Sequence, residues 1–128
     1  MSDKLKDDPP IIHIKVTVKK TDTGYDAEYD PKIIPVTEND TVLNFRLVTP
    51  TPDDVIISSV AVTPEDNTQL STPSISKNGK SMTLSDVNTV KQKFNLTFSY
   101  ATKKSDGIHA RMAAMISEYP EIENDPPG

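Results

Sequence analysis

Three acidic side chains near the C-terminus are the first candidates for chemistry. They are Glu121, Glu123 and Asp125, in the segment Glu118–Gly128, EYPEIENDPPG. Side chains two residues apart lie on one side of an extended chain, so these carboxylates could bind a hard cation such as Ca²⁺. Ile122 would point the opposite way, into the body of the protein. The preferred interpretation is a metal-free segment that docks over an open sheet edge, and we predict no cofactor.

A second candidate is the triplet Asp22-Thr23-Gly24, which also occurs in aspartic peptidases. Their chemistry needs two carboxylates that share one proton, so a chain of this size would have to form a dimer. The triplet follows the polar stretch VKKT and not an apolar run that would bury such a pair. The turn of a β-hairpin is therefore the better explanation.

Other catalytic signatures are weak or absent. The two histidines, His13 and His109, each lie on the polar face of an alternating stretch. A metal site needs two or three such ligands to converge, which this pattern does not predict, so we expect both on the surface. The sequence contains no nucleophile elbow and no glycine-rich phosphate loop.

Composition excludes several classes of protein. The chain has 128 residues, a size typical of one domain, and a formal net charge of −5, the wrong sign for a nucleic-acid partner. It has no cysteine, which excludes disulfides, thiol catalysis and the usual structural zinc sites. No apolar run is long enough to cross a membrane, and the charged N-terminus does not resemble a signal peptide. We therefore expect a cytoplasmic location.

The clearest predicted element is the stretch Lys91–Tyr100, KQKFNLTFSY. Its aromatic and aliphatic residues alternate with polar ones, placing Phe94, Leu96, Phe98 and Tyr100 on one face. Strict alternation of this kind predicts a half-buried strand. Since this stretch holds two of the three phenylalanines and one of the four tyrosines, we expect it at the centre of a sheet.

Other strands are predicted in Pro10–Lys20, Tyr25–Tyr29, Thr41–Val48 and Lys80–Leu84, where the same alternation recurs, and in the short apolar stretches Lys32–Val36 and Val55–Val62. Pro35 places its strand at an edge or a bend. The stretch Val55–Val62 is apolar on both faces, so we expect it to be covered on both. The stretch Gly107–Ser117 fits either a strand or a helix, and the turn signal Ser105-Asp106-Gly107 favours the strand.

Together these elements predict an all-β protein of about seven or eight short antiparallel strands. An immunoglobulin-like β-sandwich fits this number and spacing best. The predicted organisation is a flexible leader at residues 1–9, a β-sandwich domain at 10–117 and a docked C-terminal tail at 118–128.

The run PEIENDPP, from Pro120 to Pro127, closes this small β protein and resembles the DP-EP family of bacteria. That family is named for Asp-Pro and Glu-Pro dipeptides near the C-terminus. The resemblance implies a small intracellular immunoglobulin-like sandwich, and most such proteins have no assigned function. It also implies self-cleavage of aspartic-peptidase type at the Asp-Pro bond. There an aspartate can attack its own carbonyl through a cyclic anhydride, and a lysine amine could trap the acyl group.

This chain departs from the family pattern at both dipeptides. The first is Tyr119-Pro120 and the second is Asp125-Pro126. A tyrosine cannot supply the attacking carboxylate, and cleavage at the second dipeptide would remove only three residues. Lys103 and Lys104 are candidate cross-linking amines in the preceding loop. We expect a member of the family that does not cleave itself and keeps its tail.

The sequence therefore predicts a non-catalytic binding or structural module without an assigned biochemical role. The alternative is a self-processing aspartic-type peptidase that acts on its own C-terminal tail. The partner is not predicted, but neither a nucleic acid nor a membrane is expected. Self-association through sheet edges is compatible with the many predicted strands.

Overall fold

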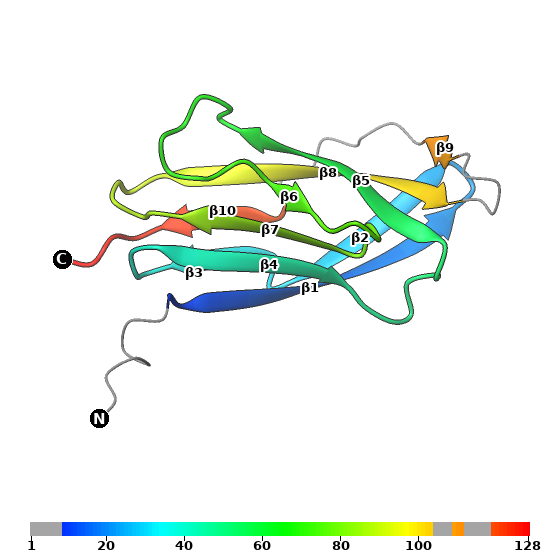
Figure 1. Ribbon diagram of the computed structural model, residues 1–128, viewed down its shortest axis with the longest axis horizontal. Helices are drawn as coiled ribbons and strands as arrows, with labels where there is room; N and C mark the ends of the chain where they lie inside the picture. Colours follow the sequence, from blue (N-terminus) through cyan, green and yellow to red (C-terminus); the bar gives the residue numbers. More distant parts are fainter. Residues whose placement is uncertain (1–8, 104–108, 112–118) are drawn as a thin grey trace.

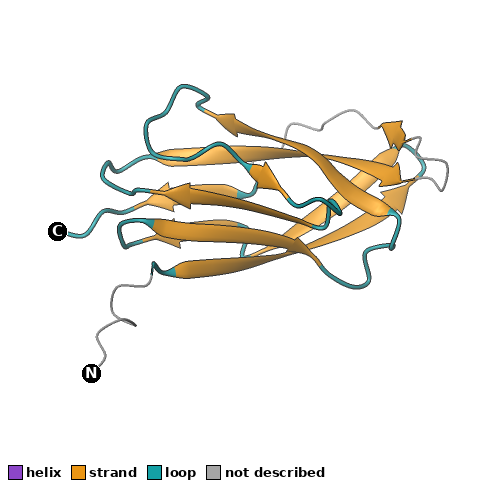
Figure 2. Cartoon of the chain, viewed as in Figure 1, coloured by secondary structure: helices purple, strands orange, loops and turns teal. Residues whose placement is uncertain are grey.

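The computed structural model describes residues 9–103, 109–111 and 119–128, and these residues form strands and loops without a helix (Figure 1; Figure 2). None of them belongs to a helix that could cross a membrane. The ten strands are β1 (Ile11–Thr21), β2 (Gly24–Asp30), β3 (Ile33–Val36), β4 (Thr41–Leu47), β5 (Val55–Thr63), β6 (Ser74–Ile75), β7 (Ser81–Asp86), β8 (Lys93–Lys103), β9 (His109–Arg111) and β10 (Glu121–Asn124).

The strands form two sheets that enclose one core. The first sheet has the order β2-β1-β4-β7-β6, and the second has the order β3-β10-β8-β5, with β9 paired to β8. The predicted all-β sandwich is therefore confirmed. Two pairings are parallel, however, β1 with β4 and β10 with β3. Both sheets are thus mixed rather than purely antiparallel, because alternation along a strand sets its buried face and not its partner.

The central strand of the second sheet is the one that the aromatic alternation predicts. Phe94, Leu96, Phe98 and Tyr100 of β8 are all buried. Phe98 reaches the other sheet, where its ring centroid lies 5.3 Å from that of Phe45 in β4. Ring contacts of this kind add to the stabilisation that burial provides, so β8 anchors both sheets to one core.

One predicted environment is wrong. The strand β5 lies at the edge of the second sheet, and Ser59, Ala61 and Thr63 on its outer face are exposed. Its inner face holds the buried Val55 and Ile57. The apolar composition of this stretch therefore reflects one covered face and not two. In contrast, β3 with its proline is an edge strand, as predicted.

The other predicted boundaries are only partly described. Residues 109–111 form β9, which agrees with the strand interpretation of that stretch, and the rest of 107–117 lies outside the described residues. Residues 1–8 and 112–118 also lie outside them. The division into leader, sandwich and tail therefore stays a prediction.

Candidate functional site

The C-terminal segment is an internal strand of the second sheet. The strand β10 lies between β3 and β8, parallel to the first and antiparallel to the second (Figure 1). Backbone hydrogen bonds hold its two sides and ends, from Glu121 N to Lys32 O (2.9 Å), Leu96 N to Pro120 O (3.1 Å), Asn124 N to Gln92 O (2.8 Å) and Asp125 N to Val36 O (2.8 Å). The sequence predicted a segment that docks over an open sheet edge. In the structure this segment is instead a paired strand inside the sheet.

The side chains of β10 alternate as expected for an extended segment. Ile122 is fully buried in the core, whereas Glu121 and Glu123 are half-buried and Asp125 is exposed. Glu123 lies opposite Lys93 of β8 in the strand register. Within residues 9–103, 109–111 and 119–128, no three histidine, aspartate or glutamate side chains gather where they could hold a metal ion. The acidic strip of the tail thus has the predicted spacing but forms no such metal-binding group.

A buried carboxyl group lies next to this strand. Asp86, the last residue of β7, is fully buried, and Asn124 of β10 is only 3% exposed. Asp86 Oδ1 accepts hydrogen bonds from the Asn124 side-chain amide (3.1 Å) and from the backbone N–H of Asn88 (2.9 Å). Since β7 and β10 belong to different sheets, these contacts fasten the C-terminal strand to the opposite layer.

Two more buried side chains extend this polar cluster, which we define as Gln69, Asp86, Asn88 and Asn124. Gln69 Oε1 accepts hydrogen bonds from the backbone N–H groups of Thr89 (2.7 Å) and Val90 (3.1 Å), and from the Asn124 amide (3.4 Å). Gln69 therefore connects the β7–β8 loop with the C-terminal strand.

Asn88 connects the same loop with β3 and the residues after it. Its side-chain amide donates to the carbonyl oxygens of Val36 (3.0 Å) and Glu38 (3.1 Å). Its backbone has a φ of 52°, in the left-handed region that asparagine tolerates better than most residues. The residue type thus suits both the turn and the contacts.

Three oxygen atoms in the polar cluster are buried without a hydrogen-bond partner among the described residues. They are Asp86 Oδ2, Asn88 Oδ1 and Asn124 Oδ1. Burial raises the pKa of Asp86, and its hydrogen bonds to Asn124 and to the Asn88 backbone oppose this effect in part. A protonated carboxyl group could donate a hydrogen bond, which an ionised one cannot. The environment therefore favours the neutral form of Asp86 more than water does.

Sequence reasoning missed this cluster, although alternation pointed to part of it. The buried positions Met82 and Leu84 continue at the next step to Asp86, and Ile122 continues in the same way to Asn124. A polar residue at an inward position of a strand is a candidate for a buried hydrogen-bonded group. No local pattern marked Gln69, because a loop position carries no periodic signal.

The predicted tail-processing residues lie in different environments. Tyr119 is half-buried, and Lys32 Nζ lies 4.9 Å from the centroid of its ring. Pro120 is buried, Asp125 is exposed and Pro126 is half-buried. The Asp-Pro dipeptide therefore lies just beyond the strand, at the surface.

The structure separates Lys103 from the tail. The strand β10 pairs with the beginning of β8, from Lys93 to Asn95, whereas Lys103 is the last residue of β8. At about 3.3 Å per residue, Lys103 is about 26 Å along the strand from Asn95, the nearest of these residues. It is therefore not placed to trap an acyl group at Asp125. Lys104 lies outside the described residues.

The peptidase-like triplet lies in a hairpin turn, and the two histidines lie on different strands. Asp22 is exposed in the turn between β1 and β2, which confirms the hairpin interpretation. His13 is exposed on the outer side of β1. His109 lies in β9, at the far end of β8 from the tail.

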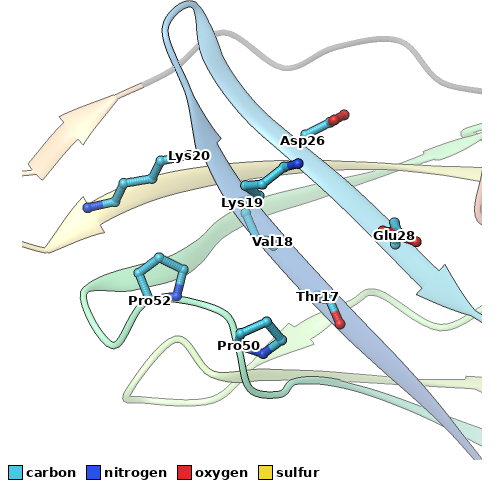
Figure 3. A pocket seen from close by; sticks show the side chains of 8 residues that line it. All are labelled: Thr17, Val18, Lys19, Lys20, Asp26, Glu28, Pro50 and Pro52. Carbon is cyan, nitrogen blue, oxygen red and sulfur yellow. The ribbon is translucent and has the colours of Figure 1, made fainter.

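A shallow hollow of about 380 Å³ lies between the β1–β2 hairpin and the β4–β5 loop. Figure 3 shows its lining residues, which are Thr17, Val18, Lys19, Lys20, Asp26, Glu28, Pro50 and Pro52. Lys19 lies opposite Asp26 in the strand register, and Lys20 forms an exposed ion pair of 2.9 Å with Asp54. Its opposite charges thus lie close to one another, so the hollow presents no concentrated charge to a ligand.

A comparison with protein families covers both the sandwich and its C-terminal strand. The profile of the DP-EP family matches residues 10–126, nearly the whole chain. The chain belongs to the DP-EP family. This match includes the C-terminal strand and both dipeptide positions, and so extends well beyond the short run near the C-terminus that first suggested it. No curated protein matches the chain.

Proposed function

We propose that this DP-EP family chain is a non-catalytic binding or structural module that keeps its C-terminal segment as part of its fold. The single observation that carries this proposal is the position of β10 between β3 and β8. Loss of this strand would expose the inner edges of two neighbours and the space that Ile122 fills. A segment that the sheet requires is better suited to a permanent structural role than to removal.

The strand order also supports the predicted immunoglobulin-like connections. The order β4-β7-β6 corresponds to strands B-E-D of an immunoglobulin sheet, and β10-β8-β5 corresponds to strands G-F-C. The β1–β2 hairpin extends the first sheet beside β4. In this correspondence the C-terminal segment is the last strand of the domain. The cytoplasmic location and the bacterial origin stay predictions from the sequence.

Intact-mass spectrometry after incubation at neutral and mildly acidic pH tests the retained tail. We expect a single mass equal to that of the full chain. Self-processing, the alternative function, would occur most simply at the exposed Asp125-Pro126 bond and would remove the last three residues. A fragment, or the loss of one water without fragmentation, would contradict the proposal.

Two truncated chains test whether the strand is needed. A chain that ends at Tyr119 lacks β10, and we expect it to lose cooperative unfolding. A chain that ends at Asp125 keeps β10 and serves as the control, which should unfold like the full chain. Equal stability of the two truncated chains would contradict a structural role for the C-terminal strand.

A further inference from the structure

The strand β5 has one open side. It pairs with β8 from Val55 to Thr63, and an antiparallel ladder uses the backbone groups of only every second residue on each side. Among the described residues, none donates or accepts a backbone hydrogen bond on the open side of Ser59–Thr63. The nearest such bond joins Ile57 N–H to Gly79 O (2.8 Å). We call residues Ser59–Thr63 the β5 edge.

The other edges described by the structure carry features that discourage strand addition. The strand β2 has an acidic residue at every second position, Asp26, Glu28 and Asp30, and β3 contains Pro35. The strands β6 and β9 have only two and three residues. The β5 edge has the sequence SVAVT, with neither a charge nor a proline. It therefore lacks two of the protections that natural sheets give to an exposed edge, and the β-bulge between Ile57 and Ser59 lies only at its start.

A groove of about 470 Å³ with a mixed polar and apolar lining runs beside the β5 edge. Half-buried Val60 and Val62 line it on the β5 side, and Leu70 and Pro73 line it on the side of the β5–β6 loop. Val60, Val62 and Leu70 also pack against the core. A strand added at this edge would cover apolar side chains as well as unpaired backbone groups, which favours association.

The two ends of β5 differ in charge. Lysines outnumber the carboxylates of Asp53 and Asp54 around its first residues, since Lys20 pairs with Asp54. Near its beginning, exposed Lys77 and Lys103 line a hollow together with Ile56 and Ser58. Just after its end, exposed Glu65 lines the groove. An antiparallel partner with the same sequence would bring its acidic end to the basic end of β5. Such a surface is complementary to itself, as a two-fold interface requires.

We propose that the β5 edge pairs antiparallel with the β5 edge of a second copy of this chain, around a two-fold axis near Ala61. Val60 and Val62 of one copy then contact the same residues of the other copy on the inner face of the joined sheet. Ala61 contacts its counterpart on the outer face. The second sheets of both copies join into one continuous sheet. A contact of about five residues from each copy is small, so the dimer is weak and forms in a concentration-dependent manner.

Sedimentation velocity of the full chain over a wide range of concentration tests this inference. We expect a shift from monomer to dimer with rising concentration. The variant Ala61→Lys places two charges face to face at the axis and should weaken dimerisation at least about tenfold. The control Ser85→Lys adds the same charge at an exposed position of β7, an inner strand of the other sheet, and should dimerise like the wild type.

Charge exchange provides a second test that does not depend on the edge substitution. Lys77→Glu and Glu65→Lys should each dimerise less than the wild type, because like charges then meet at both ends. An equimolar mixture of the two variants should dimerise again, since every facing pair is then of opposite sign. Amides of the β5 edge should also exchange hydrogen more slowly as concentration rises.

A chain that stays monomeric at all concentrations would overturn the inference. A dimer that Ala61→Lys leaves unchanged, or a mixture no stronger than its components, would overturn it as well. These results are independent of the proposed function, because a retained tail is established by mass and not by association state.

Discussion

Asn124 in the last strand donates a hydrogen bond of 3.1 Å from its side-chain amide to Oδ1 of Asp86 in the opposite sheet. The donor is the final residue of β10, and the acceptor is the final residue of β7. Both side chains are almost completely shielded from water. The register of the C-terminal strand is thus fixed by its backbone pairing and by a polar contact across the core.

Substitution of Asn124 by alanine should lower the free energy of unfolding. The change removes one of several donors to Asp86 Oδ1 and to Gln69 Oε1, and both oxygens keep backbone donors. The expected loss is that of a buried hydrogen bond, about 0.5–1.5 kcal/mol. Urea unfolding measures this difference. The neighbouring exposed residue provides the control, and Asp125→Ala should change the free energy of unfolding by less than about 0.5 kcal/mol. Equal effects of both substitutions would contradict the assigned contact.

Substitution of Asp86 by asparagine should change the pH dependence of stability. Burial raises the pKa of Asp86 in the folded protein above its ordinary value, which is about 3.9. The folded state then binds a proton that the unfolded state releases, so the free energy of unfolding falls as pH rises from about 3.9 through the raised pKa. The contribution of protonated Asp86 to the free energy of unfolding is therefore complete only below about pH 3.9.

Asp86→Asn keeps the shape of the side chain but cannot ionise, and its new amide can donate to one of the unpaired oxygens. We expect it to match the wild type in acid and to exceed its stability at neutral pH by about 1 kcal/mol. Denaturant unfolding of both proteins at a series of pH values gives the difference. If the wild type became more stable relative to the variant as pH rises, the pKa of Asp86 would be lowered and not raised in the folded protein.

Ile122→Ala should cost more than any exposed substitution in the same part of the sheet. Ile122 is fully buried, and removal of its side-chain atoms leaves a cavity at a cost of about 3 kcal/mol. Ile33 of the adjacent strand β3 is 39% exposed and is the matched control. Thermal and urea unfolding should show a clearly smaller loss for Ile33→Ala. If the two losses were the same, the tail strand would not be packed as described.

Alternation in the sequence predicted which side chains are buried, but not which strands are neighbours. The spacing of Phe94, Leu96, Phe98 and Tyr100 identified both the strand and its core face, because the period of a strand is a local property. The parallel pairing of β3 with β10 joins segments from distant parts of the chain. No local pattern encodes such a partner.

The candidate site was predictable only in part. The acidic and apolar alternation of the tail correctly placed Ile122 inside. The buried Asp86 was missed because the strand predicted at Lys80–Leu84 ends two residues before it, although Asp86 continues the inward alternation of β7. Gln69 reaches the cluster from a loop, where three-dimensional proximity alone brings it to Asn124. A contact between a loop residue and a distant strand depends on the topology of the fold and not on a local sequence pattern.

Tyr29→Phe should change stability at neutral pH and also its dependence on alkaline pH. The hydroxyl groups of Tyr29 and Tyr100 are hydrogen-bonded at 2.8 Å between the two sheets. The substitution leaves the Tyr100 hydroxyl without this partner, which costs about 1 kcal/mol. Burial raises the pKa of Tyr29 to about 12, against the effect of its bond to Tyr100, and burial also raises the pKa of Tyr100.

The folded protein therefore keeps a proton on Tyr29 that the unfolded chain loses above about pH 10, so the free energy of unfolding falls with rising pH up to about 12. In Tyr29→Phe this group is absent, and the fall should be shallower. Urea unfolding of both proteins at a series of alkaline pH values measures the two slopes. Identical slopes would contradict the raised pKa, whereas a shallower slope in the variant would link alkaline unfolding to this buried pair of hydroxyl groups.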